Sequence, residues 1–97
     1  MKTIYKYLLA ADGPAPCTVA MPAGARILSV GADCYDQLCV WAEVDPSKPL
    51  DDFKQFYVLG TGWPLIDGAL EGLKFLGSVR CDPYIWHVFL KKEIMDV

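Results

Sequence analysis

Apolar and polar residues alternate along most of this chain, and short groups of Pro, Gly and Asp interrupt the alternation at intervals of roughly ten residues. A period of two places successive side chains on opposite faces of a strand, so each alternating segment predicts a short β-strand. The predicted strands are residues 3–9, 18–21, 26–30, 38–44, 53–59, 74–80 and 84–91. About seven short antiparallel strands predict a mainly β fold, a compact sandwich or small barrel, with a small α+β fold as the alternative.

The clearest strand is 38–44, in which every second residue is aliphatic: Leu38, Val40, Ala42 and Val44. On its opposite face we expect Trp41 to pack on a second layer or to lie at a sheet edge. In the first predicted strand, both faces carry apolar side chains. One face has Ile4 and Leu8, and the other has Tyr5, Tyr7 and Leu9. We therefore expect both faces to be at least partly covered.

Residues 65–73 are the one segment where a helix competes with irregular structure. Five apolar residues there fall near a period of 3.6, namely Leu65, Ile66, Ala69, Leu70 and Leu73. Gly68 and Gly72 oppose a helix by about 1 kcal/mol each relative to Ala. The segment therefore predicts a turn or at most one short helix.

Length and composition add one expectation about the surface. We expect the 97 residues to form one domain over residues 1–97. Hydrophobic residues make up 54% of the chain and the mean hydropathy is +0.25. A short chain has a high ratio of surface to volume, so this composition predicts either an exposed apolar patch for self-association or a partner, or an unusually well-filled small core.

The charge pattern bears on the classes of ligand. The net charge is −3, the pI is near 4.9 and the nine Lys and Arg residues are dispersed along the sequence, which disfavours direct contact with nucleic acid or an anionic membrane surface. Charged residues interrupt the N-terminal apolar run, and no apolar stretch approaches the roughly 18 residues that a membrane span needs. We expect a cytosolic protein.

Four cysteines are present, and their spacing is not that of a metal site. Cys17, Cys34, Cys39 and Cys81 include no Cys-x-x-Cys pair. Without a secretory signal, reduced thiols that pack as small hydrophobes are the better interpretation. We expect no metal and no cofactor.

His87 is the only histidine, so a mechanism that needs an imidazole has to use it. It lies in a predicted strand on the same side as Ile85 and Phe89, where a hydrogen-bonded packing role or a response to pH is the commoner interpretation. A thiolate paired with His87 stays open as an alternative, but no glycine-rich elbow precedes any cysteine. We predict no catalytic residues.

The loop after residues 53–59 holds the main candidate contact residues. Gly60, Thr61 and Gly62 fit a strand-ending turn better than a phosphate loop, although they could line a small-molecule site. Trp63 follows, and it either anchors a partner or folds back onto the core. Partner contacts are predicted at Trp63, Thr61 and the loop aromatic residue Tyr35.

An ordered set of motifs resembles a family of small proteins encoded by tailed phages and prophages. The motifs are residues 4–7 (IYKY), 21–30 (MPAGARILSV), 39–45 (CVWAEVD), 57–62 (YVLGTG), 73–79 (LKFLGSV) and 86–89 (WHVF). This sequence departs from that family at Trp63, where members tend to carry His, and in the region of Cys17 and Cys34. Both departures argue against a shared metal or catalytic site.

The resemblance implies a non-enzymatic phage accessory protein in the host cytosol. It would bind and inhibit a host protein, such as a CRISPR effector or another component of anti-phage defence. Two alternatives stay open: a sponge that sequesters a nucleotide immune signal at a dimer interface lined by Gly60, Thr61 and Gly62, and a minor structural protein of the phage. A homo-oligomer is compatible with each.

Overall fold

The computed structural model describes residues 1–11, 13 and 15–92, and this part of the chain forms seven β-strands and no helix. The strands are β1 (Thr3–Leu8), β2 (Cys17–Met21), β3 (Arg26–Ala32), β4 (Leu38–Val44), β5 (Asp52–Gly60), β6 (Leu73–Cys81) and β7 (Tyr84–Lys91). All seven predicted strands are present, and each observed end lies within two residues of its prediction. The mainly β fold class is confirmed.

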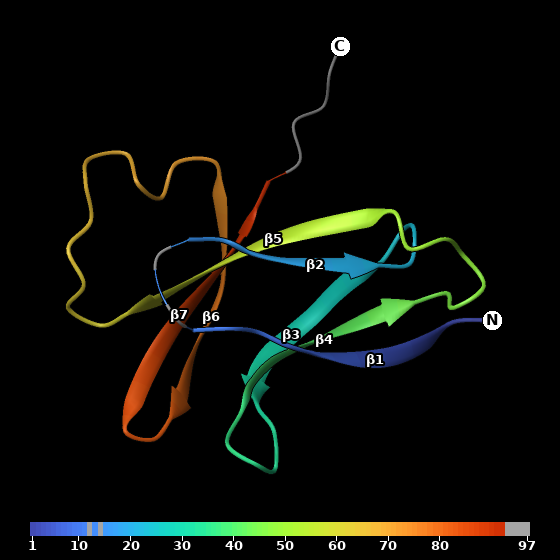
Figure 1. Cartoon of the computed structure of the whole chain (residues 1–97), viewed down its shortest axis with the longest axis horizontal. Coiled ribbons are helices and arrows are strands. Elements are labelled where there is room, and N and C mark those ends of the chain that lie inside the picture. The colour runs from blue at the N-terminus through green and yellow to red at the C-terminus, as the bar shows by residue number, and fades with distance from the viewer. Residues whose placement is uncertain (12, 14, 93–97) are drawn as a thin grey trace.

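The strands form two antiparallel sheets, as Figure 1 shows. One sheet has the order β1-β4-β3 and the other has the order β2-β5-β7-β6. The edge strands β3 and β6 approach one another, and a Cβ on Gly77 of β6 would lie 3.0 Å from a Val30 methyl group of β3. The Cα extents of 41 × 41 × 17 Å describe a flattened sandwich.

The core lies between the two sheets and is built from alternate residues of the central strands. The aliphatic face of β4 is buried as predicted, and it packs in one cluster with side chains of the other sheet. Fully buried members from that second sheet are Phe56 of β5, Val88 of β7 and Met21 of β2. Burial of these large apolar side chains is the main favourable contribution to folding.

Trp41 lies on the outer face of β4, the middle strand of its sheet, and it is half-buried. On the adjacent strand β3, Gly31 is the diagonal neighbour of Trp41, and a Cβ there would lie 2.9 Å from the Trp41 ring. The indole therefore covers the backbone of Gly31. The predicted placement of Trp41 at a sheet edge is wrong, because β4 is the middle strand of its sheet. The Trp41 ring packs on Gly31, which belongs to the same sheet.

The expectation that both faces of β1 are covered is wrong. Five of its six residues are exposed, including Ile4 and Leu8, and only Tyr7 is half-buried. β1 is an edge strand, so it has a neighbour on one side only, and its outer face has no second layer above it. Leu9, just beyond the strand, is buried and joins the core.

Residues 61–72 join β5 to β6 as a loop that projects from one side of the molecule (Figure 1). The prediction of a turn is correct and the short helix is absent. Backbone N–H groups of Ala69 and Leu73 donate to the carbonyls three residues before them, which forms single turns. Gly68 and Gly72 have φ of +79° and +74° at the third position of these turns, and this left-handed conformation ends each turn before a helix can propagate.

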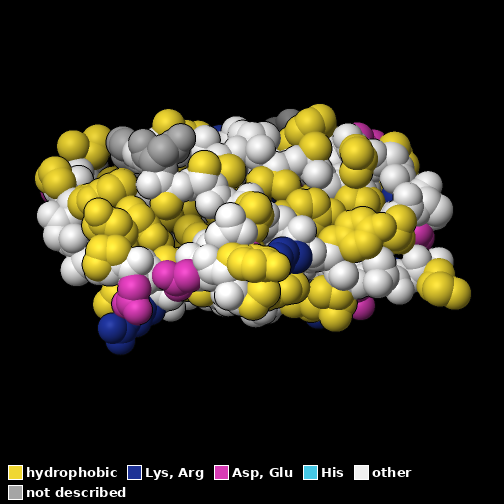
Figure 2. All heavy atoms as spheres, turned by 60° about the horizontal axis from the view of Figure 1, so that its bottom comes forward, with side chains coloured by type: hydrophobic (Ala, Val, Ile, Leu, Met, Phe, Trp, Pro, Cys, Tyr) yellow, Lys and Arg dark blue, Asp and Glu magenta, His cyan; other side chains and the backbone are white. Residues whose placement is uncertain are grey.

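The surface carries many large apolar side chains, as expected from the composition, whereas their role in self-association or partner binding stays a prediction. Figure 2 shows hydrophobic side chains spread over most of one face, with few charged groups between them. The exposed aromatic residues are Tyr5, Tyr35, Phe53, Trp63, Phe75 and Tyr84. Within the described residues, there is no helix of the length and apolarity that crossing a membrane requires.

Candidate functional site

The candidate site is built around the turn that ends β5. The Trp63 N–H donates to the Gly60 carbonyl at 3.2 Å, and Gly62 has φ +85°, which is the third position of a type II turn. The strand-ending turn is therefore the correct interpretation of Gly60–Thr61–Gly62. A Cβ on Gly60 would lie 2.6 Å from Trp63 Nε1, so the indole of Trp63 rests directly on the Gly60 backbone.

Three aromatic rings meet beside this turn. Register pairs Gly60 with Trp86, and the rings of Trp63 and Trp86 stand nearly perpendicular with centroids 5.7 Å apart. Tyr84 lies two residues before Trp86 on the same face of β7, with its ring centroid 5.3 Å from that of Trp86. Edge-to-face and tilted pairs of this kind are the favoured aromatic geometries, so each ring holds the next in place.

These rings line an open pocket of about 600 Å³. Its lining comes from three segments: Ala11 after β1, the turn residues Gly60, Thr61 and Trp63, and the start of β7 with Pro83, Tyr84, Ile85 and Trp86. Tyr84 and Ile85 are exposed, and Trp63 retains 36% of its surface exposed. Trp63 thus folds back onto Trp86 and stays partly exposed. We call this site the aromatic pocket.

His87 connects the aromatic pocket to the outer face of its sheet. Its Nε2 lies 2.7 Å from Thr61 Oγ1, and its Nδ1 lies 2.7 Å from Ser78 Oγ. A neutral imidazole donates from one nitrogen and accepts at the other, so one hydroxyl accepts from the ring and the other donates to it. The chain of three side chains ties the 60–63 turn to β6 and β7.

Ser78 is the one member of this chain that the sequence interpretation missed, although a signal for it existed. Asp82 and Pro83 form the two-residue connection of the β6–β7 hairpin, whose register pairs Cys81 with Tyr84. Counting three further steps from that pair places Ser78 opposite His87. Thr61 could not be found in this way, because the β5–β7 pairing joins segments far apart in the sequence.

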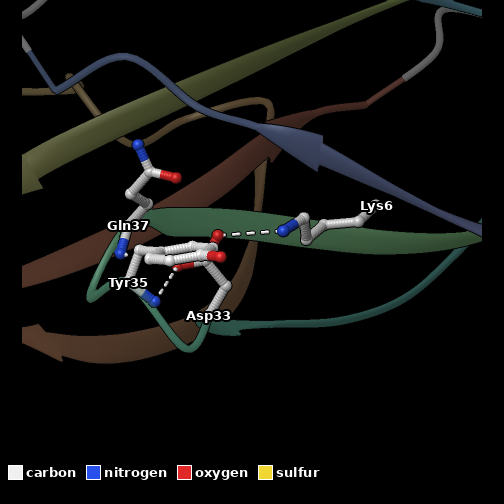
Figure 3. Close-up of polar contacts among 4 residues, drawn as sticks. All are labelled: Lys6, Asp33, Tyr35 and Gln37. Carbon is white, nitrogen blue, oxygen red and sulfur yellow. Dashed lines mark hydrogen bonds and ion pairs between the residues drawn. The ribbon is translucent and has the colours of Figure 1, made fainter.

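Tyr35, the third predicted partner contact, lies at the tip of the β3–β4 turn and is not among the residues that line the aromatic pocket. It is highly exposed, and its N–H donates to Asp33 Oδ1 at 2.9 Å. The Gln37 N–H donates to the same oxygen, and Lys6 Nζ of β1 lies 2.9 Å from Asp33 Oδ2, as drawn in Figure 3. The Lys6 hydrogen bond, with the two backbone donors, lowers the pKa of Asp33.

The cysteines do not form a reactive centre with His87. No described cysteine is hydrogen-bonded to His87, and all four thiols are free. Burial raises the pKa of Cys39, and burial with the nearby Asp36 and Asp33 carboxylates raises the pKa of Cys81. A raised pKa keeps these thiols protonated and poorly nucleophilic. Among the described residues, no group of three or more His, Cys, Asp or Glu side chains is arranged to hold a metal ion.

Fold and pocket together define a small antiparallel β-sandwich with an open aromatic pocket at one end of its larger sheet. The chain belongs to the family described as Domain of unknown function (DUF7352), whose sequence model matches residues 1–95. No curated protein matches the chain. No solved structure matches it either.

Proposed function

We propose that this protein is a non-enzymatic binding protein and that the aromatic pocket is its main contact surface. The observation that carries the proposal is the set of Trp63, Trp86 and Tyr84 rings, fixed against one another but open to solvent on one side. Trp and Tyr are the residues most enriched among those that dominate binding energy at interfaces. Rings already held in position lose little conformational freedom on binding, which favours affinity.

The hydrogen-bond pattern at His87 supports a binding role over catalysis. Both ring nitrogens are engaged by hydroxyl groups, and no carboxylate among the described residues orients the imidazole. The chain of contacts fixes Thr61, and with it the turn that presents Trp63. In this proposal His87 is a positioning residue for the pocket.

The partner that we propose is a host protein. The resemblance to small proteins of tailed phages and prophages suggests an inhibitor of a host factor, with a component of anti-phage defence as the first candidate. A protein segment with an apolar or proline-rich side fits the pocket, since aromatic-lined grooves bind such segments. The pocket volume of about 600 Å³ lies within the usual range for a specific site.

The test is affinity purification from host cells with matched variants. Tagged wild-type protein should retain one stoichiometric protein partner, and Tyr84→Ala should lose it, because removing a central contact typically weakens binding by about 30-fold or more. Tyr5→Ala, which removes an exposed tyrosine from β1, is the control and should retain the partner. Absence of a partner for the wild type, or its retention by Tyr84→Ala, contradicts the proposal.

The nucleotide sponge is the second candidate, because Gly60 and Thr61 line the aromatic pocket and its rings could stack on a base. It predicts that a cyclic nucleotide raises the melting temperature of the protein, and that a tighter-binding nucleotide raises it more at the same concentration. A panel of cyclic mono- and dinucleotides that produces no shift removes this candidate.

A further inference from the structure

A second pocket lies at the opposite end of the same sheet from the aromatic pocket. It has a volume of about 730 Å³ and is lined where β5 and β6 begin and β7 ends. Its lining residues are Phe53, Lys54, Gln55, Lys74, Leu90, Lys91 and Lys92. The four lysines come from β5, from the β6–β7 hairpin and from the position just after β7, and we call this site the lysine pocket.

The lysine pocket holds four of the nine Lys and Arg residues of a chain with twelve acidic residues. Cations elsewhere are mostly paired with carboxylates: Lys2 and Arg26 with Glu43, Lys6 with Asp33, and Arg80 with Asp82. Within the pocket, Lys54 pairs with Asp52. Among the carboxylates that the structure describes, none forms an ion pair with Lys74, Lys91 or Lys92.

The sheet register places these charges at neighbouring positions. Lys74 pairs with Leu90, Leu73 pairs with Lys91, and the Lys92 N–H donates to the Gly72 carbonyl at 2.9 Å. Lys74, Lys91 and Lys92 therefore lie at consecutive steps of the β6–β7 ladder, where side chains alternate between the two faces of the sheet at its end.

Phe53 adds an aromatic surface to this charged pocket. Its side chain is 64% exposed, although Phe usually prefers burial. It lines the pocket together with the lysines. A flat apolar ring beside several ammonium groups matches a ligand that has a planar base at one end and phosphates at the other.

We propose that the lysine pocket binds a nucleoside polyphosphate. Lys74, Lys91 and Lys92 hold its phosphate groups through charge-assisted hydrogen bonds, and its base stacks on Phe53. The volume is within the usual range for a small-molecule site, and the lysines surround a concavity instead of forming the extended stripe that a nucleic-acid backbone needs. The lysine pocket shares no lining residue with the aromatic pocket, so the two proposals can be tested independently of each other.

The test is calorimetric titration of the full chain with two probes, ATP and inorganic triphosphate, at about 50 mM salt, where screening is weak. Both probes should bind, and ATP should bind more tightly because its base contacts Phe53. The double variant Lys74→Met/Lys92→Met should weaken both by about tenfold or more, since it removes two charged donors and keeps the aliphatic stems. Phe53→Ala should weaken ATP and leave triphosphate unchanged.

The matched control is Lys2→Met/Lys48→Met, which changes the net charge by the same amount at lysines outside the pocket. Its affinity for both probes should stay within about twofold of the wild type. The proposal is overturned if neither probe binds, or if the control loses as much affinity as the pocket variant. Equal binding of ATP and triphosphate, with no effect of Phe53→Ala, overturns the nucleoside part of the proposal. Lys74 and Lys92 are both exposed, and an unchanged melting temperature confirms that the pocket variant is folded.

Discussion

Gly60→Ala tests the packing that forms the aromatic pocket. The added Cβ would lie 2.6 Å from Nε1, 2.7 Å from Cε2 and 3.1 Å from Cδ1 of Trp63. Ordinary contacts begin near 3.4 Å, so the indole has to move by about 0.8 Å or more. Gly60 has no positive φ, and the backbone itself therefore accepts alanine. The whole effect of the substitution should act through the ring of Trp63.

The expected cost follows from what this movement disturbs. Crowding a packed site typically costs about 1–3 kcal/mol, and the edge-to-face pair with Trp86 contributes about 0.5–1.5 kcal/mol of its own. Alanine also restricts the unfolded chain, which offsets about 0.4–1 kcal/mol. We expect Gly60→Ala to lower the free energy of unfolding by about 1–2 kcal/mol. For a domain of this size that corresponds to roughly 4–16 °C in melting temperature.

A double-mutant cycle with Trp63→Ala provides the assay. Urea unfolding gives the free energy of unfolding for the wild type, both single variants and the double variant, and near-ultraviolet circular dichroism reports the Trp63–Trp86 pair. In the Trp63→Ala background the crowding is gone, so Gly60→Ala should become neutral or slightly stabilising. An equal cost of Gly60→Ala in both backgrounds would show that its effect does not pass through Trp63 and would refute the packing argument.

Three further predictions concern the core, the Asp33 turn and the thiols. Phe56→Ala should cost about 3–5 kcal/mol in the free energy of unfolding, measured by urea denaturation, because Phe56 is fully buried at the centre of the core. The pKa of Asp33 is lowered in the folded state, so its stabilising effect is present above the unfolded pKa near 4 and is lost as the pH falls through the folded value. The difference in stability between wild type and Asp33→Asn should therefore be constant from pH 5 to 7 and shrink below about pH 4, and a difference that does not change with pH contradicts the assignment. In thiol labelling of the native protein, exposed Cys34 should react first, whereas the buried Cys39 and Cys81, whose pKa values are raised, should react only on unfolding; rapid labelling of either would contradict their burial.

The strands and the inner face of β4 could be predicted from the sequence because both depend on local alternation. The series Leu38, Val40, Ala42 and Val44 has the period of a strand, and it is the buried face in the structure. The same alternation in β1 led to the wrong prediction that both of its faces are covered. The pattern shows which residues share a face, but it does not show whether another layer covers that face. The exposure of Ile4 and Leu8 follows from the edge position of β1, which the sequence does not encode locally.

The two pockets depend on pairing between strands, which explains why the sequence predicted the aromatic pocket only in part and the lysine pocket not at all. Gly60, Thr61 and Trp63 were predicted as contacts because a Gly-rich turn before Pro is conspicuous, but their meeting with Trp86 requires the β5–β7 register. The lysines are dispersed along the sequence, and only the register of β5, β6 and β7 gathers them. The dispersed cations argued only against nucleic acid and anionic membranes as ligands, and the sequence did not predict that four lysines line one pocket.

The edge position of β1 also has a consequence for the order of folding during synthesis. β1 leaves the ribosome before its hydrogen-bonding partner β4, and β2 and β3 are synthesised between the two. At about 5–20 residues per second, the residues between Leu8 and Val44 take roughly 2–7 seconds to translate. During that time the backbone of β1 has no partner strand, and its apolar side chains have no sheet to pack in. Over this interval β1 is exposed to chaperones and to association with other nascent chains.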